Sequence, residues 1–484
     1  MFDLIIKNGT VVFPNRFIRK TDIGVVDGKI AMIGSGIDSA RKGNVINAED
    51  RFVFPGIVDS HFHIGIYRPL SEDAKSESAS AAAGGVTTIL SYFRSGKNYM
   101  NTSGPYSVIY DKVLEQVRGK FYTDYGFSLA PITQEHVEEI PKLVKNKGVS
   151  TFKFYMFYKG LNLKSEFKKG SVEREYLLSD DPYDLGHLYN IMSKIASMDK
   201  EAKDVRLSIH AEDAEIIRIN LEKVRKEAKK LGLNPLQAYN RARPPLAERI
   251  AIIEAFELAN QTGCPINIVH VSSELALSTV KQMKITYPSV DVMVEATPSH
   301  LTLTDDSAAG VHGKVNPPIR SRDDKAALWR GIVQGDINTV GSDHACIEDS
   351  KKGKELWTAE NGYGATELML PSLVTEGYVN RKVPLERVCA LLTMNPAKVH
   401  GVYGRKGDIG IGFDADFVIF DPSHKKVVRH EKLHSAQDFT PFEGLELSGW
   451  AQTTILRGKV IYDKESLIGE PSGEYLKRPI RAYA

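Results

Sequence analysis

Cysteine is scarce in this chain. Three cysteines, Cys264, Cys346 and Cys389, lie far apart among 484 residues. An odd and scattered set of thiols excludes a disulfide framework and fits a reducing compartment. The sequence also lacks an apolar run of about 18 residues, the length that a membrane-spanning helix requires, and its start lacks the basic and apolar segments of a signal peptide. We therefore expect a cytoplasmic protein.

An excess of charge of one sign is also missing. The formal net charge is +2 at pH 7, with 26% charged and 42% hydrophobic residues. A balance so close to neutral gives no reason to expect a nucleic acid or a membrane surface as a partner. The length suits one large domain and one smaller domain.

Short β-rich segments occupy both ends of the chain. Asn8-Gly9 and Asp27-Gly28 each separate two β-rich runs, a pattern typical of hairpins. The segments "ADFVIFD" and "TTILRGKVIYD" near the other end look alike. We predict a small β-sandwich domain assembled from residues 1–54 and 401–484.

The middle of the chain, residues 55–400, alternates strands with helical stretches. The eight predicted strands are "FVFPGIVDSHFH", "VTTILSYF", "YGFSLAP", "STFKFYM", "RLSIHAE", "INIVHVSS", "VDVMVEATP" and "NTVGSDHA". Eight strands with helical crossovers predict an α/β fold of the (β/α)8 TIM-barrel type. A doubly wound open sheet is the alternative for the same pattern.

Side chains that can bind a metal lie at or near five predicted strand ends. They are His61 and His63 on the first strand, Lys153 on the fourth, His210 on the fifth, His270 on the sixth and Asp343 on the eighth. Barrel enzymes place their chemistry where strands end. A single histidine there would more often be a packing residue, but four histidines and an aspartate at comparable depth indicate a metal site.

Lys153 lies in a run of aromatic residues that reads as a buried strand. A buried ammonium is costly and would repel bound cations. Two divalent ions need anionic ligands, and an amine that reacts with CO2 becomes a carbamate whose two oxygens can bridge them. A neutral buried lysine, or one that extends to the rim, is the alternative.

The segments "PGIVDSHFH", "TFKFYMFYKG", "IHAED", "VHVSS" and "GSDHA" closely resemble, in order, the metal motifs of the amidohydrolase superfamily. The nearest resemblance is to its dihydropyrimidinase/hydantoinase branch of cyclic amidohydrolases, and it covers nearly the whole chain. It implies two Zn²⁺ ions per chain. His61 and His63 would bind one and His210 and His270 the other, with N6-carboxylated Lys153 as the bridge and Asp343 on the first metal.

The resemblance also implies a reaction. A metal-bound hydroxide would attack the carbonyl of a cyclic amide or imide, of the hydantoin or dihydropyrimidine type, and open the ring. Asp343 would act as general base and then as general acid. Tyr158 resembles the family tyrosine that stabilises the oxyanion and contacts the substrate; an aromatic wall residue is its alternative role.

Two asparagines resemble substrate-binding positions of the family. Asn361 in "ENGYG" matches an asparagine that holds the imide edge of the ring, and Asn316 in "KVNPPIR" stands where this branch usually has serine. "NPPIR" is more similar to the dihydroorotase form, but Gly65 replaces the arginine expected two residues after His63. Arg68 could still reach a substrate carboxylate; a salt bridge at the rim is the alternative, which we favour. Asp59 could orient a ligand imidazole; a structural role is the alternative.

Alternatives remain for the activity. A dihydroorotase-like or allantoinase-like hydrolase is one, and a non-enzymatic dihydropyrimidinase-related scaffold protein is another; retention of all six ligand positions argues against the scaffold. The branch tends to form tetramers, so we expect a homo-oligomer, a tetramer or dimer. The segment "LNLKSEFKKGSVEREYLLSDDP" is an insert relative to the branch, and we expect it to overhang the barrel mouth.

Overall fold

The computed structural model describes residues 1–37, 43–96, 99–158, 182–198 and 204–479. Nearly all of the predicted insert lies outside these residues. Two large sheets organise the described chain, one in the middle of the sequence and one built from both ends. No helix in the described part has both the length and the apolar character needed to cross a bilayer.

The central sheet is a parallel barrel, as the alternation of strands and helices predicts. Every strand pair in it is parallel, in the order β13-β12-β11-β10-β9-β8-β7-β6-β14. The strands are β6 (Ile57–His63), β7 (Val86–Phe93), β8 (Asp124–Leu129), β9 (Thr151–Tyr155), β10 (Arg206–His210), β11 (Ile266–Ile268), β12 (Val292–Ala296), β13 (Thr339–Val340) and β14 (His344–Ala345). Since β13 pairs with β12 and β14 pairs with β6, these two short segments are the halves of one interrupted eighth strand that closes the barrel.

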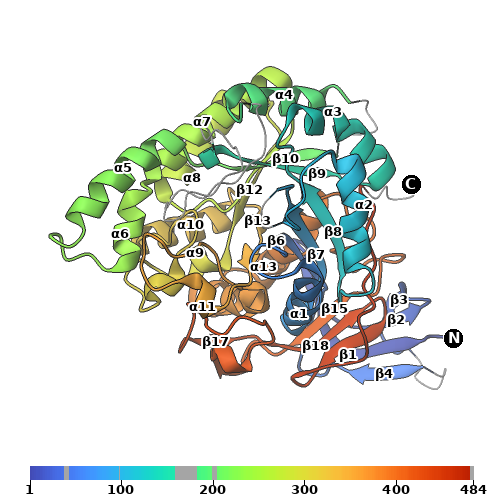
Figure 1. The fold of residues 1–484 in the computed structure, drawn as a ribbon. Helices are drawn as coiled ribbons and strands as arrows, with labels where there is room; N and C mark the ends of the chain where they lie inside the picture. Colours follow the sequence, from blue (N-terminus) through green and yellow to red (C-terminus); the bar gives the residue numbers. More distant parts are fainter. Residues whose placement is uncertain (38–42, 97–98, 159–181, 199–203, 480–484) are drawn as a thin grey trace.

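Helices cover the outside of the barrel (Figure 1). Their bounds are α1 (Leu70–Ala83), α2 (Tyr106–Val117), α3 (Gln134–Lys142), α4 (Leu185–Ala196), α5 (Ala214–Glu227), α6 (Pro235–Ala242), α7 (Pro245–Thr262), α8 (Glu274–Thr286), α9 (Pro298–Thr302), α10 (Arg322–Gln334), α11 (Asp349–Lys352), α12 (Met369–Leu373), α13 (Leu385–Leu392) and α14 (Met394–Val399). Several begin at residues whose side-chain oxygen accepts a backbone N–H of the first turn, among them Asp213 before α5 and Ser273 before α8.

The second sheet contains strands from both ends of the chain, as predicted. Figure 1 shows the blue N-terminal strands beside the red C-terminal strands. It comprises β1 (Leu4–Phe13), β2 (Phe17–Val26), β3 (Lys29–Gly34), β4 (Asn44–Asn47), β5 (Phe52–Pro55), β15 (Phe417–Phe420), β18 (Ala451–Leu456), β19 (Lys459–Asp463) and β20 (Ser466–Leu467). It encloses its own apolar cluster, which includes Ile6, Val25 and Phe417. A separate hairpin joins β16 (Lys425–Val427) and β17 (Glu446–Ser448).

Two details differ from the predicted strands. Asn8-Gly9 is not a turn: β1 continues through it, and the register against β2 shifts there because Asn8 adopts a left-handed backbone (φ 61°) and forms a bulge. The chain reverses later, around Asn15. The predicted strand over residues 52–63 is two strands, of which β5 belongs to the terminal sheet and β6 to the barrel. The Asp27-Gly28 hairpin between β2 and β3 is confirmed.

Candidate metal centre

The end of β6 and the break in the eighth strand bring three predicted ligands together. His61 Nε2 lies 3.1 Å from Asp343 Oδ1, and His63 Nε2 lies 3.3 Å from the same oxygen. Ligand atoms of these three residues all lie within 4.8 Å of one another. Nitrogen and carboxylate donors at this spacing form a donor set that suits Zn²⁺.

The break that carries Asp343 depends on local backbone geometry. Asp343 has φ 53°, a left-handed conformation that ends the pairing of β13 before β14 begins. Gly341 precedes it, and a Cβ there would lie 2.6 Å from His61 Cβ and 2.9 Å from Glu295 Oε2. Only glycine lets the backbone pass this close to the histidine, so Gly341 and Asp343 together set the position of the carboxylate.

His210 and His270 form the other half of the site. Their ring centres are 4.3 Å apart, and His270 lies 5.2 Å from His61, so the four predicted histidines form one contiguous group. Burial, with a contribution from the charge of Lys153, lowers the pKa of His210 to about 4 and that of His270 well below its usual value. These imidazoles are therefore neutral near pH 7, the form that binds metals.

Lys153 lies at the centre of the group on β9. Its side chain is fully buried, its Nζ has no hydrogen-bond partner among the described residues, and it lies 4.2 Å from the centre of the Tyr92 ring. Burial lowers the pKa of Lys153 to about 7, against the charges of Glu295 and Asp343, which act to raise it. A carbamate forms from the neutral amine, so this environment favours carboxylation of Lys153, which would supply the anionic ligand that two divalent ions need.

Buried acids hold two of the histidine rings. Glu295 Oε1 lies 2.6 Å from His61 Nδ1, and Glu212 Oε2 lies 2.6 Å from His210 Nε2. The remaining ring nitrogen, Nε2 of His61 and Nδ1 of His210, is left to coordinate a metal. Of the two roles open to Asp59, orientation of an imidazole and a structural role, its contacts favour the structural one, because it accepts the backbone N–H groups of His61 and Ser342.

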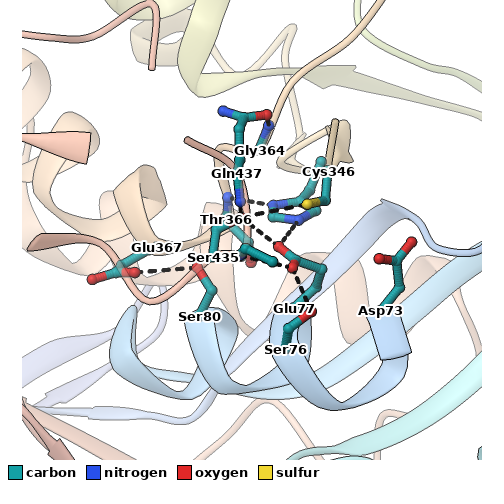
Figure 2. Close-up of polar contacts among 12 residues, drawn as sticks. Asp73, Ser76, Glu77, Ser80, Cys346, Gly364, Thr366, Glu367, Ser435 and Gln437 are labelled. Atoms are coloured by element: carbon teal, nitrogen blue, oxygen red, sulfur yellow. Dashed lines mark hydrogen bonds and ion pairs between the residues drawn. The ribbon is translucent and has the colours of Figure 1, made fainter. Parts of the chain in front are cut away.

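Two other acidic groups in the described residues have a similar spacing, but each already contains a cation. Asp73, Glu77 and Cys346 form the first group, where Arg68 Nη1 lies 3.4 Å from Asp73 Oδ1 and 3.6 Å from Glu77 Oε1. Figure 2 shows Glu77 bonded to Ser435, with Asp73 to one side. Arg68 is therefore paired with these acids. This agrees with the salt-bridge role and not with contact to a substrate carboxylate.

The second group, Asp124, Asp414 and Asp416, surrounds Lys406, whose Nζ lies 2.6 to 2.8 Å from all three carboxylates. A lysine or arginine at the centre compensates the acids and excludes a second cation by repulsion. The group around Asp343 differs, because its lysine, Lys153, has no hydrogen-bond partner in the described part of the chain and has a pKa lowered to about 7. The residues of that group therefore fit a metal centre, and the other two do not.

Tyr158 follows β9 in a short 3₁₀ turn (Met156–Tyr158) and is buried. Its ring packs 4.3 Å from Phe157, and Phe157 packs 4.5 Å from His210. The turn thus carries Tyr158 to the same side of the barrel as His210.

Asn316 and Asn361 come together although 45 residues separate them in the sequence. The Tyr239 hydroxyl on α6 lies 2.6 Å from Asn316 Oδ1 and 3.0 Å from Asn361 Oδ1. His344, the residue after Asp343, pairs with Tyr363, so the Asn361 segment runs beside the eighth strand. Both asparagines are partly exposed.

Four residues near the centre were not predicted from the sequence: Glu295, Glu212, Arg243 and Tyr239. A signal existed for the two glutamates. Glu212 lies two residues after His210, and Glu295 lies near the end of a predicted strand, so each had a position expected of a partner for a ligand histidine. Arg243 and Tyr239 lie on a helix and its end, with no such pattern.

Comparisons with known proteins agree with this geometry. Residues 184–461 match the model of the amidohydrolase family. The chain is 30% identical to a D-hydantoinase of Geobacillus stearothermophilus, over 98% of this chain and 96% of the relative. It is 31% identical to an allantoinase of Bacillus licheniformis, over 98% and 99%. The solved L-hydantoinase (dihydropyrimidinase) of Arthrobacter aurescens superposes with a TM-score of 0.83 at 29% identity, covering 99% of this chain and 100% of that one.

Proposed function

The chain belongs to the amidohydrolase family, and from that membership we propose that it is a binuclear zinc hydrolase that opens the ring of a hydantoin or dihydropyrimidine. Its relatives named hydantoinase and allantoinase make it a hydrolase of C–N bonds in cyclic amides. The observation that carries the zinc proposal is the convergence of His61, His63 and Asp343 near a buried lysine that has no hydrogen-bond partner among the residues described.

Six side chains would hold the metals. They are His61, His63, Lys153 as its carbamate, His210, His270 and Asp343. When bound, two zinc ions supply a hydroxide near pH 7 and polarise the ring carbonyl. An imidazole binds a metal in its neutral form and adds no charge, so the carbamate on Lys153 and the carboxylate of Asp343 would compensate the ions.

In the proposed reaction, Asp343 would transfer the proton from the attacking water to the leaving group. Burial raises the pKa of an isolated carboxyl, but the neighbouring His61 and His63 hold the pKa of Asp343 well below its usual value. The ionised carboxylate can accept a proton from the attacking water and pass it to the departing ring nitrogen. Tyr158 would donate a hydrogen bond to the carbonyl oxygen as negative charge develops there.

Asn316 and Asn361 would bind the substrate ring. Support comes from their shared contact with Tyr239 and from the position of the Asn361 segment beside the strand that follows Asp343. An allantoinase activity is the second candidate, because relatives of equal similarity carry that name. The dihydroorotase alternative is weakened, since Arg68 is paired with Asp73 and Glu77.

The proposal is tested by a hydrolysis screen of the zinc-loaded protein against hydantoin, dihydrouracil, allantoin and dihydroorotate. We expect ring opening of hydantoin or dihydrouracil with the highest kcat/KM. Preferential turnover of allantoin would favour the second candidate. No turnover of any of the four compounds by a protein that holds two zinc ions would contradict the proposal.

A further inference from the structure

His270 is held differently from His61 and His210. Its Nδ1 has no hydrogen-bond partner in the part of the chain that the structure describes, whereas His61 and His210 each have a buried glutamate at one ring nitrogen. The backbone of His270 is left-handed, with φ 40°, which is a strained conformation for a residue with a Cβ and persists only where the surroundings hold it. The position of this ligand therefore depends on what holds the backbone around it.

A single carboxylate, that of Glu248 on α7, holds the segment after His270. The Ser272 N–H donates to Glu248 Oε1 at 3.0 Å, and the Ser272 hydroxyl donates to Oε2 at 2.8 Å. The Ser273 hydroxyl donates to the same oxygen at 2.9 Å and accepts the Ala276 N–H at the start of α8. The glutamate and both serines are buried, so the backbone two and three residues after His270 has little freedom to move.

Arg320, two residues before α10, compensates Glu248 and joins it to the end of α6. Its Nη2 lies 2.9 Å from Glu248 Oε2, and its Nε donates to Ser272 Oγ at 2.9 Å. Its Nη1 donates to Asn240 Oδ1 and to the carbonyl oxygen of Arg243, at 2.6 Å in each case. Arg320 is buried. The five N–H donors of a planar guanidinium allow all these contacts at once, which a lysine ammonium cannot reproduce.

Arg243 extends this connection to His210. Its Nε lies 3.0 Å from Glu212 Oε1, and its Nη2 lies 2.5 Å from Glu212 Oε2. Glu212 Oε2 in turn lies 2.6 Å from His210 Nε2. Two acids and two guanidinium groups therefore form one buried unit between His210 and His270, with formal charges that cancel. A change to one member affects its neighbours, because a buried charge must keep its partner.

We infer that Arg320 is a positioning residue for the zinc site formed by His210 and His270. It acts on one histidine through α7 and on the other through the end of α6, so it sets the distance between the two ligands. The zinc site on the other side has a separate support, since Glu295 holds the His61 ring. The inference rests on the proposed function, which requires two zinc ions, and deepens it.

Arg320→Lys tests the inference. The substitution keeps a positive charge beside Glu248 but loses the simultaneous contacts with Ser272 and the end of α6. We expect the zinc affinity of the site at His210 to fall by about tenfold to a hundredfold, and that of the site at His61 to change by less than about threefold. Competition with a chromophoric chelator gives the two affinities. Anomalous diffraction at the zinc edge assigns them, with a full peak beside His61 and a depleted peak beside His210.

Ser272→Ala is a milder variant, which removes one hydroxyl between Arg320 and Glu248 and decides the question if Arg320→Lys does not fold. We expect the same site to weaken by about threefold to tenfold. Arg387→Lys on α13 is the matched control. Its guanidinium donates to the carbonyl oxygens of residues 332 and 337 on the outside of the barrel, so this variant should keep both zinc affinities.

Two results would overturn the inference while leaving the proposed function intact. One is equal weakening of both zinc sites, which would mark Arg320 as a general support of the fold. The other is wild-type affinity at both sites in Ser272→Ala and in a folded Arg320→Lys. A wild-type protein that does not hold two zinc ions would instead remove the proposed function, and this inference with it.

Discussion

Two of the ligand histidines in the candidate centre are held by acids that do not bind the metal. Glu295 fixes the His61 ring, and Glu212 fixes the His210 ring. Asp59 accepts backbone N–H groups of His61 on β6 and of Ser342, the residue before Asp343, and so holds these two segments together. Glu295 also accepts from Ser60 Oγ at 3.2 Å, so its carboxylate cannot rotate freely. Such partners set which ring nitrogen carries the proton and how basic the other one is.

Glu295→Gln should therefore weaken zinc binding without unfolding the protein. The amide is the same size and can still accept from His61 Nδ1, but it lacks the charge that makes the imidazole a stronger ligand. We expect zinc affinity to fall by about tenfold to a hundredfold, measured by competition with a chromophoric chelator. Glu257→Gln on α7, where the carboxylate accepts from the Tyr287 hydroxyl near the surface, is the control. Equal affinities for wild type and Glu295→Gln would contradict the role assigned to Glu295.

Asp343→Asn tests the proton carrier. An amide can coordinate weakly but cannot accept a proton, so we expect partial zinc content with kcat reduced by at least about a thousandfold. Zinc analysis and initial rates on the same preparation give both values. A variant within about tenfold of wild type, roughly 1.4 kcal/mol of barrier, would show that another group moves the proton.

The convergence of the six candidate ligands could be predicted, because strand ends in a barrel meet at one face, so side chains at five strand ends share one place. Their partners could not. The contact of Glu295 with His61 joins residues 234 apart, and an acid at a strand end is unremarkable until the register around the barrel is known. Tyr239 could not be predicted for the same reason, since its hydroxyl contacts Asn316 and Asn361, which lie on loops distant in the sequence.

At the scale of elements, α1 supports β14, the half-strand that begins directly after Asp343. Glu77 on α1 lies 2.8 Å from His344 Nε2, and His344 stacks on Phe62 with ring centres 4.4 Å apart. Phe62 stands between His61 and His63 on β6. His344 on β14 thus joins α1, through Glu77, to β6, through Phe62. The sequence predicted the eighth strand but not its interruption, because the break depends on the left-handed backbone of Asp343.

Glu77→Gln should lower stability in a pH-dependent way. Burial opposes ionisation of Glu77, but His344 and Ser435 lower its pKa from 4.5 to about 2. Because the pKa is lower in the folded protein than in the unfolded chain, the contribution of the charge, roughly 3 kcal/mol, is complete above about pH 4.5 and is lost as the pH falls toward 2.

Urea unfolding of wild type and Glu77→Gln measures this. The difference in free energy of unfolding should be constant between about pH 7 and 5.5 and should shrink by about 1 kcal/mol or more at pH 3.5. Glu72→Gln, an exposed residue of the same helix, should show little difference at any pH. A Glu77→Gln difference that stays constant down to pH 3.5 would contradict the account.

At the scale of the whole molecule, one buried lysine ties the barrel to the terminal sheet. Lys406 bonds Asp124 at the start of β8 and Asp416 next to β15, and Arg457 at the end of β18 pairs with Asp124 as well. The chain ends therefore meet the barrel through charges as well as through apolar packing. The composition of the terminal sheet could be predicted from its β-rich segments, but this connection could not, because each partner comes from a different part of the sequence.

Lys406→Met should leave three buried carboxylates without their common cation. We expect a loss of about 3 to 5 kcal/mol in the free energy of unfolding, measured by denaturant titration, with zinc content unchanged under native conditions. Lys425→Met removes an exposed ion pair with Glu446 and should cost less than about 1 kcal/mol. Similar losses for the two variants would show that the Lys406 cluster does not join the sheet to the barrel.

The central claim is that Lys153 bridges two zinc ions as a carbamate, and zinc content per chain tests it most directly. Wild type and Lys153→Ala, expressed with zinc and bicarbonate and freed of loose metal, are compared by elemental analysis. The account predicts two zinc ions in the wild type and loss of tight binding in Lys153→Ala, partly restored by propionate, whose carboxylate can enter the vacated space. A Lys153→Ala protein that keeps two zinc ions would contradict it.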